Sequence, residues 1–153
     1  MSVVQLAVYI EPQDSSWHRV FSPTLEWVQG IADCIHPCIP LDGWNLGVMF
    51  TDDKTITAYN AQRGKSRATN VLAWCYAEDS AWPDQESYGD IVISGETALQ
   101  EAQDQAVSLE YRLAQLLVHG VLHALGYDHE RSERDELIMQ SLEEQCMQNF
   151  QKL

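Results

Sequence analysis

The first half of the chain carries short apolar segments whose pattern predicts four β-strands. From Val4 to Ile10 every second residue is a branched apolar one, which is the period of a strand with one buried face. Segments rich in β-branched and aromatic residues predict three more strands over residues 44–52, 69–77 and 90–94. Residues 78–89 hold several acids, a proline and a glycine without any periodicity, so a loop is expected there.

A first helix is expected between the first two strands. Ser22 is the predicted N-cap and Pro23 the first helical residue, because the fixed φ of proline suits that position. Four apolar residues then recur at helical spacing and form the predicted buried face: Leu25, Val28, Ala32 and Ile35. A second, short helix is expected over residues 55–62, with Asp52 or Asp53 as its cap.

Helical periodicity resumes after the fourth strand and continues toward the C-terminus. Helices are predicted over residues 95–106 and 108–125, the second capped by Ser108 and ended by Gly126 in the left-handed conformation. A last helix is predicted from about Ser132 to Phe150. Its expected buried stripe is Ile138, Leu142, Cys146 and Phe150. Residues 1–153 are therefore expected to form a single α/β domain, with a roughly four-stranded mixed sheet packed by about five helices.

Charge and cysteine content narrow the range of partners and the compartment. With 23 acidic and 9 basic residues the net charge is -14, which argues against broad attraction to DNA, other nucleic acid or anionic lipid. No apolar stretch is long enough to span a membrane. The four cysteines are too few and scattered for a disulfide scaffold, and the N-terminus is typical of a strand rather than an export signal. A cytoplasmic location is therefore expected.

One basic segment departs from this acidic composition. Arg63, Lys65 and Arg67 fall within five positions, so they can form a local site that attracts anions. The simpler alternative is a solvated turn. For Lys65 and Arg67 that alternative is favoured, whereas a guanidinium such as that of Arg63 can hold a phosphate through two parallel hydrogen bonds.

The segment VHGVLHALGYDH holds three of the five histidines. His119 and His123 are four residues apart and share one face of a helix, and a reversal at Gly126 can bring His129 back over the helix end. This H-x-x-x-H-x-x-G-x-x-H spacing is the ligand arrangement of the metzincin proteases. The sequence therefore predicts one zinc ion at the end of a central helix, with three nitrogen ligands and an open fourth position. The alternative is that these are ordinary histidines of a leucine-rich helix.

The protease signature has a glutamate directly after the first histidine, and this chain has Gly120 there. Without that general base, zinc-dependent peptide hydrolysis would need a carboxylate from elsewhere, for which Glu130 and Glu96 are candidates. A zinc metalloprotease-like hydrolase therefore stays open as an alternative.

The same residues resemble a known family. The segment HGVLHALGYDH is similar to the H-G-x-L-H-x-x-G-Y-D-H signature of the YbeY family. The segment YNAQRGKSRATNVLAW resembles that family's block of an arginine-glycine turn followed by a strand, and YGDIVIS resembles its G-D-I-x-I-S strand. The similarity runs over about residues 50–145. It departs at Ala68, where proline is common, and at Ala73 and Trp74, where Ser-Phe is usual.

The resemblance implies a metal-dependent endoribonuclease that cuts single-stranded RNA in rRNA maturation, including processing of the 16S-type 3′ end, and in ribosome quality control. It implies that His119, His123 and His129 bind Zn²⁺ and that Arg63 and His119 act in catalysis, with Lys65 and Arg67 as accessory contacts to RNA. Ribosomal proteins or a ribosome-associated GTPase are possible partners, and a non-catalytic assembly factor with a structural metal is a further alternative.

Overall fold

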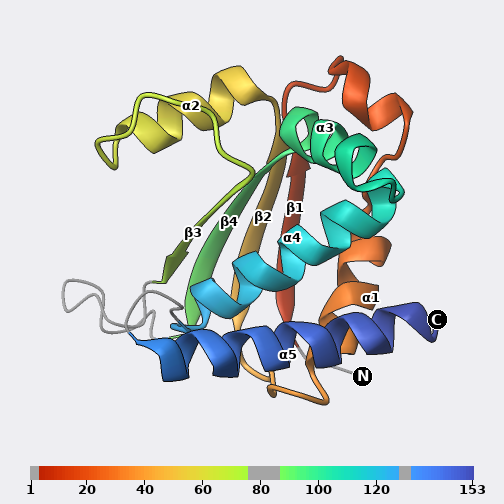
Figure 1. The fold of residues 1–153 in the computed structure, drawn as a ribbon, viewed down its shortest axis with the longest axis vertical. Coiled ribbons are helices and arrows are strands. Elements are labelled where there is room, and N and C mark those ends of the chain that lie inside the picture. Colours follow the sequence, from red (N-terminus) through yellow and green to blue (C-terminus); the bar gives the residue numbers. More distant parts are fainter. Residues whose placement is uncertain (1–3, 76–86, 128–131) are drawn as a thin grey trace.

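The computed structural model describes residues 4–75, 87–127 and 132–153 (Figure 1). The predicted fold class is confirmed, because a four-stranded mixed sheet is packed by five α-helices. In chain order the elements are β1 (Gln5–Ile10), a short 3-10 helix η1 (Ser16–Arg19), α1 (Leu25–Ile35), β2 (Asn45–Thr51), α2 (Asp53–Ala61), β3 (Val71–Cys75), β4 (Tyr88–Ser94), α3 (Gly95–Gln105), α4 (Leu109–Ala124) and α5 (Glu133–Gln151).

The strands lie in the order β1-β2-β4-β3. β1 and β2 are parallel, as are β2 and β4, while β3 pairs antiparallel with β4 and forms one edge of the sheet. In the registers Val48 lies beside Ile91, and Ile91 lies beside Ala73. The two central strands are the most buried, as expected for parallel strands that are covered by helices.

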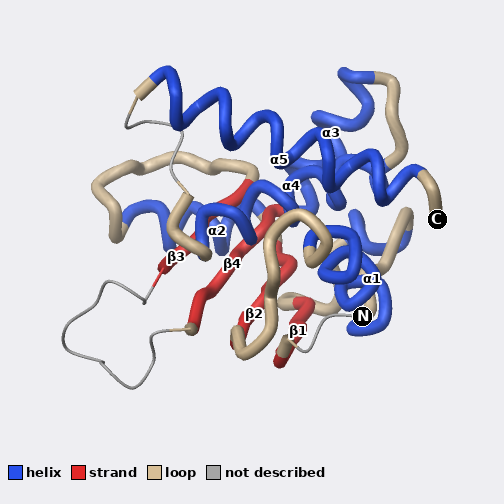
Figure 2. Tube along the Cα trace, turned by 90° about the horizontal axis from the view of Figure 1, so that it is seen from below, coloured by secondary structure: helices blue, strands red, loops and turns tan. Residues whose placement is uncertain are grey.

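Helix α4 lies at the centre of the helical layer. In Figure 1 it crosses in front of the sheet, and Figure 2 shows it between the sheet and α5; it contacts β3, β4, α3 and α5. The main core lies on this side of the sheet and includes Val48, Phe50 and Ile91, whereas Met49 and Val92 face the other side. There a smaller core forms around Ile56 of α2. A residue's face on each strand thus follows the period-two rule.

Most helix ends were predicted correctly because they depend on local chemistry. The side chains of Asp52, Ser108 and Ser132 each accept a backbone N–H in the first turn of their helix. Gly126 has a φ of 101°, as predicted for the left-handed end of α4. The predicted cap Ser22 was wrong: the helix begins two residues later, where the Thr24 hydroxyl accepts the N–H of Trp27 at 3.1 Å.

Two predicted apolar faces need correction. On α5 the buried residues are Met139, Cys146 and Met147, whereas Ile138 is 41% exposed. The other three members of the predicted stripe do pack on the core, because Cys146 is buried and Leu142 and Phe150 lie against it, partly buried. With 3.6 residues per turn a four-residue repeat drifts about 40° per step, so its first member, Ile138, is turned out of the buried face. On α1, Leu25 is exposed because the buried face begins only at Val28.

Candidate functional site

Helix α4 carries His119 and His123 on one face, near its C-terminal end. Their ring centroids lie 4.6 Å apart with an angle of 63° between the planes, and both side chains are partly buried. The chain turns directly afterwards, because the N–H groups of Gly126 and Tyr127 bond back to the carbonyls of His123 and Leu122. The turn that was predicted to return the chain over the helix end is therefore present. His129 lies outside the described residues.

Gly120 allows α4 to approach the sheet closely. A Cβ atom at this position would lie 2.7 Å from Cγ2 of Ile91 and 3.1 Å from Cγ2 of Val71, closer than ordinary van der Waals contact. A glutamate here would require α4 or the side chains of β3 and β4 to shift, although Gly120 itself lines the same cavity as the histidines. Of the substitute bases, Glu96 accepts the N–H of Asp53 at 2.8 Å and so caps α2 from the start of α3. Glu130 lies outside the described residues.

The basic segment after α2 is organised by Asn60. Asn60 is only 3% exposed; its carbonyl oxygen accepts the N–H groups of Arg63 and Lys65, and its side-chain amide donates to the carbonyl of Arg67 at 3.0 Å. Gly64 supplies the positive φ, 83°, that the turn requires. One buried asparagine thus fixes the backbone at three basic positions, a role that the sequence reasoning missed.

Arg63 lies against the edge strand. Its guanidinium donates to the backbone carbonyl of Ala73 and lies over the ring of Trp74, 4.6 Å from the ring centroid. Burial lowers the pKa of Arg63 from its usual value, because a cation that loses water becomes harder to keep charged. An arginine stays protonated despite such a shift, so the group remains a positive charge held in a defined place.

One cavity of about 280 Å³ joins the two sequence features. Arg63, Lys65 and Arg67 line it from the basic turn, and His119 and His123 line it from α4. The remaining lining residues come from the end of α2, the start of β3 and α4: Asn60, Thr69, Asn70, Val71, Leu72, Ala73 and Gly120. The structure therefore brings together five of the predicted site residues, although 52 or more positions separate the basic turn from the histidines.

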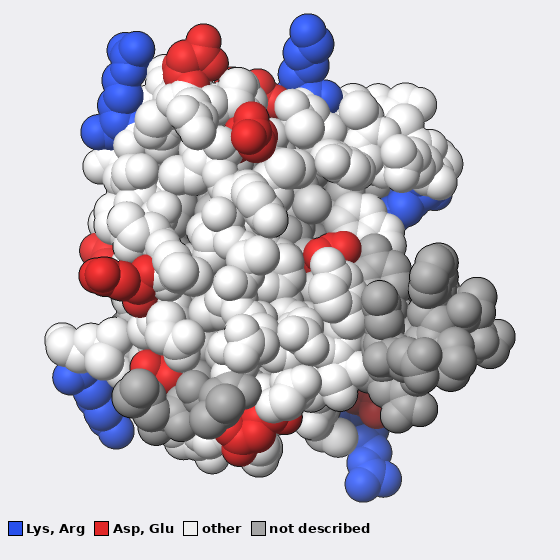
Figure 3. Space-filling model, turned by 180° about the vertical axis from the view of Figure 1, so that it is seen from behind, with Lys and Arg blue, Asp and Glu red and all other residues white. Residues whose placement is uncertain are grey.

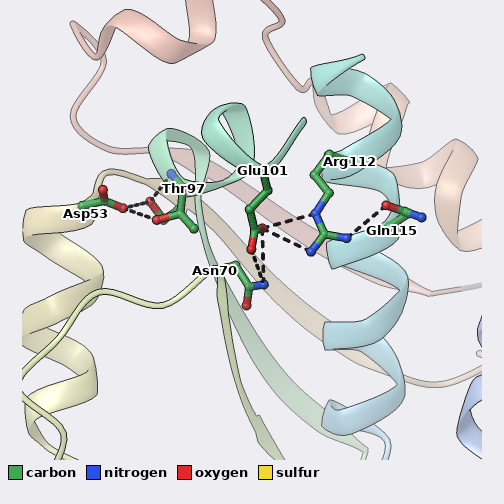
Figure 4. A network of polar contacts seen from close by, with 7 residues as sticks. Asp53, Asn70, Thr97, Glu101, Arg112 and Gln115 are labelled. Atoms are coloured by element: carbon green, nitrogen blue, oxygen red, sulfur yellow. Dashed lines mark hydrogen bonds and ion pairs between the residues drawn. The ribbon is translucent and has the colours of Figure 1, made fainter. Parts of the chain in front are cut away.

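A second cavity of about 360 Å³ continues from the first, since Asn70, Val71 and His119 line both. Here Oε1 of Glu143 on α5 lies 2.5 Å from Nδ1 of His119. The amide of Asn70 donates to Glu101 at 3.3 and 3.4 Å, and Arg112 donates to the same carboxylate twice at 3.2 Å (Figure 4). This network fixes the first residues of β3 beside the histidines.

The donors present fit a metal ion of the zinc type. Two imidazoles one helical turn apart face one cavity, and the Nδ1 of His119 bonds to a carboxylate, as the imidazoles of metal sites commonly do. Within residues 4–75, 87–127 and 132–153, no three His, Cys, Asp or Glu side chains are grouped to hold a metal ion. The third predicted ligand belongs to the segment outside these ranges.

Among the described residues, basic side chains are scattered on the side of the molecule that faces away from the view of Figure 1. Figure 3 shows that face with acidic side chains spread over it and basic ones set apart near its margins. The turn after α2, by contrast, holds three of the nine basic residues within five positions, Arg63, Lys65 and Arg67. In the part of the chain that the structure describes, no helix is both long and apolar enough to cross a membrane.

Comparison with known proteins identifies the family. The model of the family described as endoribonuclease YbeY matches residues 11–151. The chain belongs to the YbeY family. It is 35% identical over 130 residues to the endoribonuclease YbeY of Persephonella marina, covering 84% of this chain and 85% of the relative. It is 44% identical over 108 residues to that of a Roseiflexus species, covering 67% of this chain and 68% of the relative.

These matches confirm the expected YbeY family and with it a hydrolase of the nuclease type. They also extend the similarity that the sequence motifs indicated, from about residues 50–145 to residues 11–151. The solution structure of a Thermotoga maritima protein has the same fold, with a TM-score of 0.63, 20% identity, and coverage of 95% of this chain and 88% of that one.

Proposed function

We propose that this YbeY protein is a zinc-dependent endoribonuclease that cuts single-stranded RNA and acts on rRNA, including its 3′ end, during ribosome maturation and quality control. The observation that carries the proposal is the cavity shared by the basic turn and the two histidines of α4. A phosphodiester that enters it would meet both a guanidinium and two imidazoles. The YbeY relatives described above are named as endoribonucleases, which supports the same reaction.

Arg63 is the proposed phosphate-binding and catalytic cation. The carbonyl of Ala73 and the ring of Trp74 hold its guanidinium, so little ordering is needed when RNA binds. A preorganised cation stabilises charge that develops on the phosphoryl oxygens, which is commonly the largest contribution to such a reaction. Lys65 and Arg67 extend the positive wall and serve as accessory contacts to neighbouring phosphates.

His119, His123 and His129 are the proposed ligands of one zinc ion, and His119, which lines both cavities, is the histidine proposed to act in catalysis. When bound, zinc supplies a Lewis acid and lowers the pKa of a bound water. These imidazoles would hold the ion at the part of the cavity that α4 lines, and Arg63 lines the same cavity from the basic turn. The apolar packing of α4 on β3 and β4 keeps the two histidines fixed relative to the basic turn.

The two rival functions receive less support. A zinc protease requires a general base, and Gly120, at the position of that base, has no side chain and lies too close to β3 and β4 to accept one without a shift. A non-catalytic assembly factor would have no need of a guanidinium in the same cavity as the proposed metal ligands, so the presence of Arg63 there favours the enzyme. The same proposal includes action in the cytoplasm and partners such as ribosomal proteins or a ribosome-associated GTPase. The acidic net charge of the protein suits contact with basic ribosomal proteins.

The test uses a labelled single-stranded RNA with the zinc-loaded protein, its chelator-treated form and three variants. Arg63→Ala should lower cleavage by about 10²–10³-fold, the usual cost of removing one preorganised charge-stabilising group, while zinc content and fold remain. His123→Ala should lose both zinc and cleavage. Lys65→Ala is the control and should change cleavage only slightly.

Mass spectrometry of the RNA ends then separates attack by the ribose 2′-OH, which leaves a 2′,3′-cyclic phosphate, from attack by hydroxide. Casein incubated in parallel should stay intact. Cleavage of casein but not RNA would favour the protease, and full RNA cleavage by Arg63→Ala would contradict the proposed site.

A further inference from the structure

Helix α5 carries a carboxylate on its apolar face. Met139, Glu143 and Met147 follow one another at four-residue spacing on α5, and both methionines belong to the main core. Both methionines are buried, at 1% and 8% exposure, and the Glu143 side chain is 30% exposed. A methionine or leucine would fit this row without desolvating a charge, so packing alone does not account for a glutamate here.

The contact that Glu143 makes is specific and short. Its Oε1 lies 2.5 Å from Nδ1 of His119, across the interface between α5 and α4, and both side chains are about 30% exposed. A carboxylate can only accept, so the proton of this hydrogen bond is on Nδ1. A neutral imidazole with its proton on Nδ1 has its lone pair on Nε2.

We propose that Glu143 is a positioning residue that sets the tautomer and ring orientation of His119, so that Nε2 presents a lone pair to the metal ion. This inference rests on the proposed function, because it assumes that His119 is a metal ligand. An isolated neutral imidazole in water prefers its proton on Nε2, the form that cannot bind a metal through that atom. Glu143 reverses this preference before the metal arrives and also fixes the ring about its Cβ–Cγ bond.

The position of Glu143 explains how α5 takes part in the site. Met139 and Met147, one turn to either side, anchor the helix on the core, so the carboxylate between them is held at a constant distance from α4. The adjacent Glu144 lines the same second cavity but is exposed, and so it provides a matched control for the loss of one negative charge. The role therefore belongs to one carboxylate rather than to the acidic character of the helix.

The experiment compares Glu143→Met, Glu143→Gln and Glu144→Gln with the wild type in the full-length protein. In metal-free samples in alkaline buffer, long-range ¹H–¹⁵N NMR spectra identify which nitrogen of His119 carries the proton. Titration with Zn²⁺ against a chromophoric chelator gives the affinity. Denaturation in urea shows whether each variant is folded.

Glu143→Met should move the His119 proton to Nε2 and weaken zinc binding by about 10–100-fold, the usual cost of losing such a partner, while the fold is retained. Glu143→Gln keeps an acceptor oxygen, so the tautomer should stay as in the wild type and the loss of affinity should be smaller. Glu144→Gln should match the wild type in both measurements.

An unchanged tautomer or zinc affinity in Glu143→Met would overturn the positioning role, as would an equal loss in Glu144→Gln. If the zinc series follows the expected order but RNA is not cut, the proposed function fails and the positioning role stands. If the wild type binds no zinc, both fail.

Discussion

The same substitution, glycine to alanine, should have opposite effects in two helices of this protein. In α4, the Cβ of Gly120→Ala would lie 2.7 Å from Cγ2 of the buried Ile91, a β-branched methyl group that cannot swing away. Overpacking of this kind costs about 1–3 kcal/mol. Alanine recovers about 1 kcal/mol through its better helix propensity. The free energy of unfolding should therefore fall by up to about 2 kcal/mol.

Gly30 in α1 is the matched control. A Cβ there meets no atom within 4 Å, and its φ is not in the left-handed region. Gly30→Ala should therefore raise the free energy of unfolding by about 0.5–1 kcal/mol through helix propensity and a less flexible unfolded chain.

Urea denaturation of both variants gives the two free energies, and zinc titration shows whether α4 has moved. Because relief of the clash must shift α4 away from β3 and β4, Gly120→Ala should also weaken zinc binding, and Gly30→Ala should not. If Gly120→Ala is as stable as the wild type or more stable, the close approach of α4 to the sheet is not what requires glycine at this position.

Two further predictions concern the basic turn and a buried thiol. Asn60→Ala removes the donor to the carbonyl of Arg67 and should lower the free energy of unfolding by about 1–3 kcal/mol. RNA cleavage should fall while zinc affinity is unchanged. Unchanged cleavage would show that the basic turn does not need the hydrogen bonds of Asn60. Burial, with the neighbouring thiols of Cys38 and Cys34, raises the pKa of Cys146 from 9.0 to about 12. Because the unfolded chain then loses its thiol proton first, stability is fully present below about pH 9 and should decrease as the pH rises toward 12, and this decrease should be smaller in Cys146→Ala. Equal pH profiles measured by urea denaturation would contradict that assignment.

The parts of the fold that follow from local chemistry could be predicted from the sequence. The caps Ser108 and Ser132 and the glycine turn after α4 each depend on a few neighbouring residues, and the structure confirms them. The start of α1 was harder, because Ser22 and Thr24 are both good caps and only the packing of the helix selects between them. The antiparallel pairing of β3 at the edge depends on contacts across the sheet and has no local signal.

The candidate site shows the same division. The histidine spacing and the cluster of basic residues are visible in the sequence, and the structure places both around one cavity. Glu143 was missed because it meets His119 from another helix, 24 residues away in the chain. A signal was present in principle, since an acid within a row of buried methionines breaks the expected pattern. It went unread because the predicted buried stripe of α5 began at Ile138 instead of Met139.

The place of Arg63 on β3 also affects how the protein behaves in a crowded solution. An edge strand presents unpaired carbonyl and amide groups, which another molecule can use to extend the sheet. The guanidinium of Arg63 occupies the carbonyl of Ala73, in the middle of that strand, and adds a charge there. The residue that is proposed to hold RNA therefore also hinders intermolecular strand pairing, and its removal is expected to favour self-association.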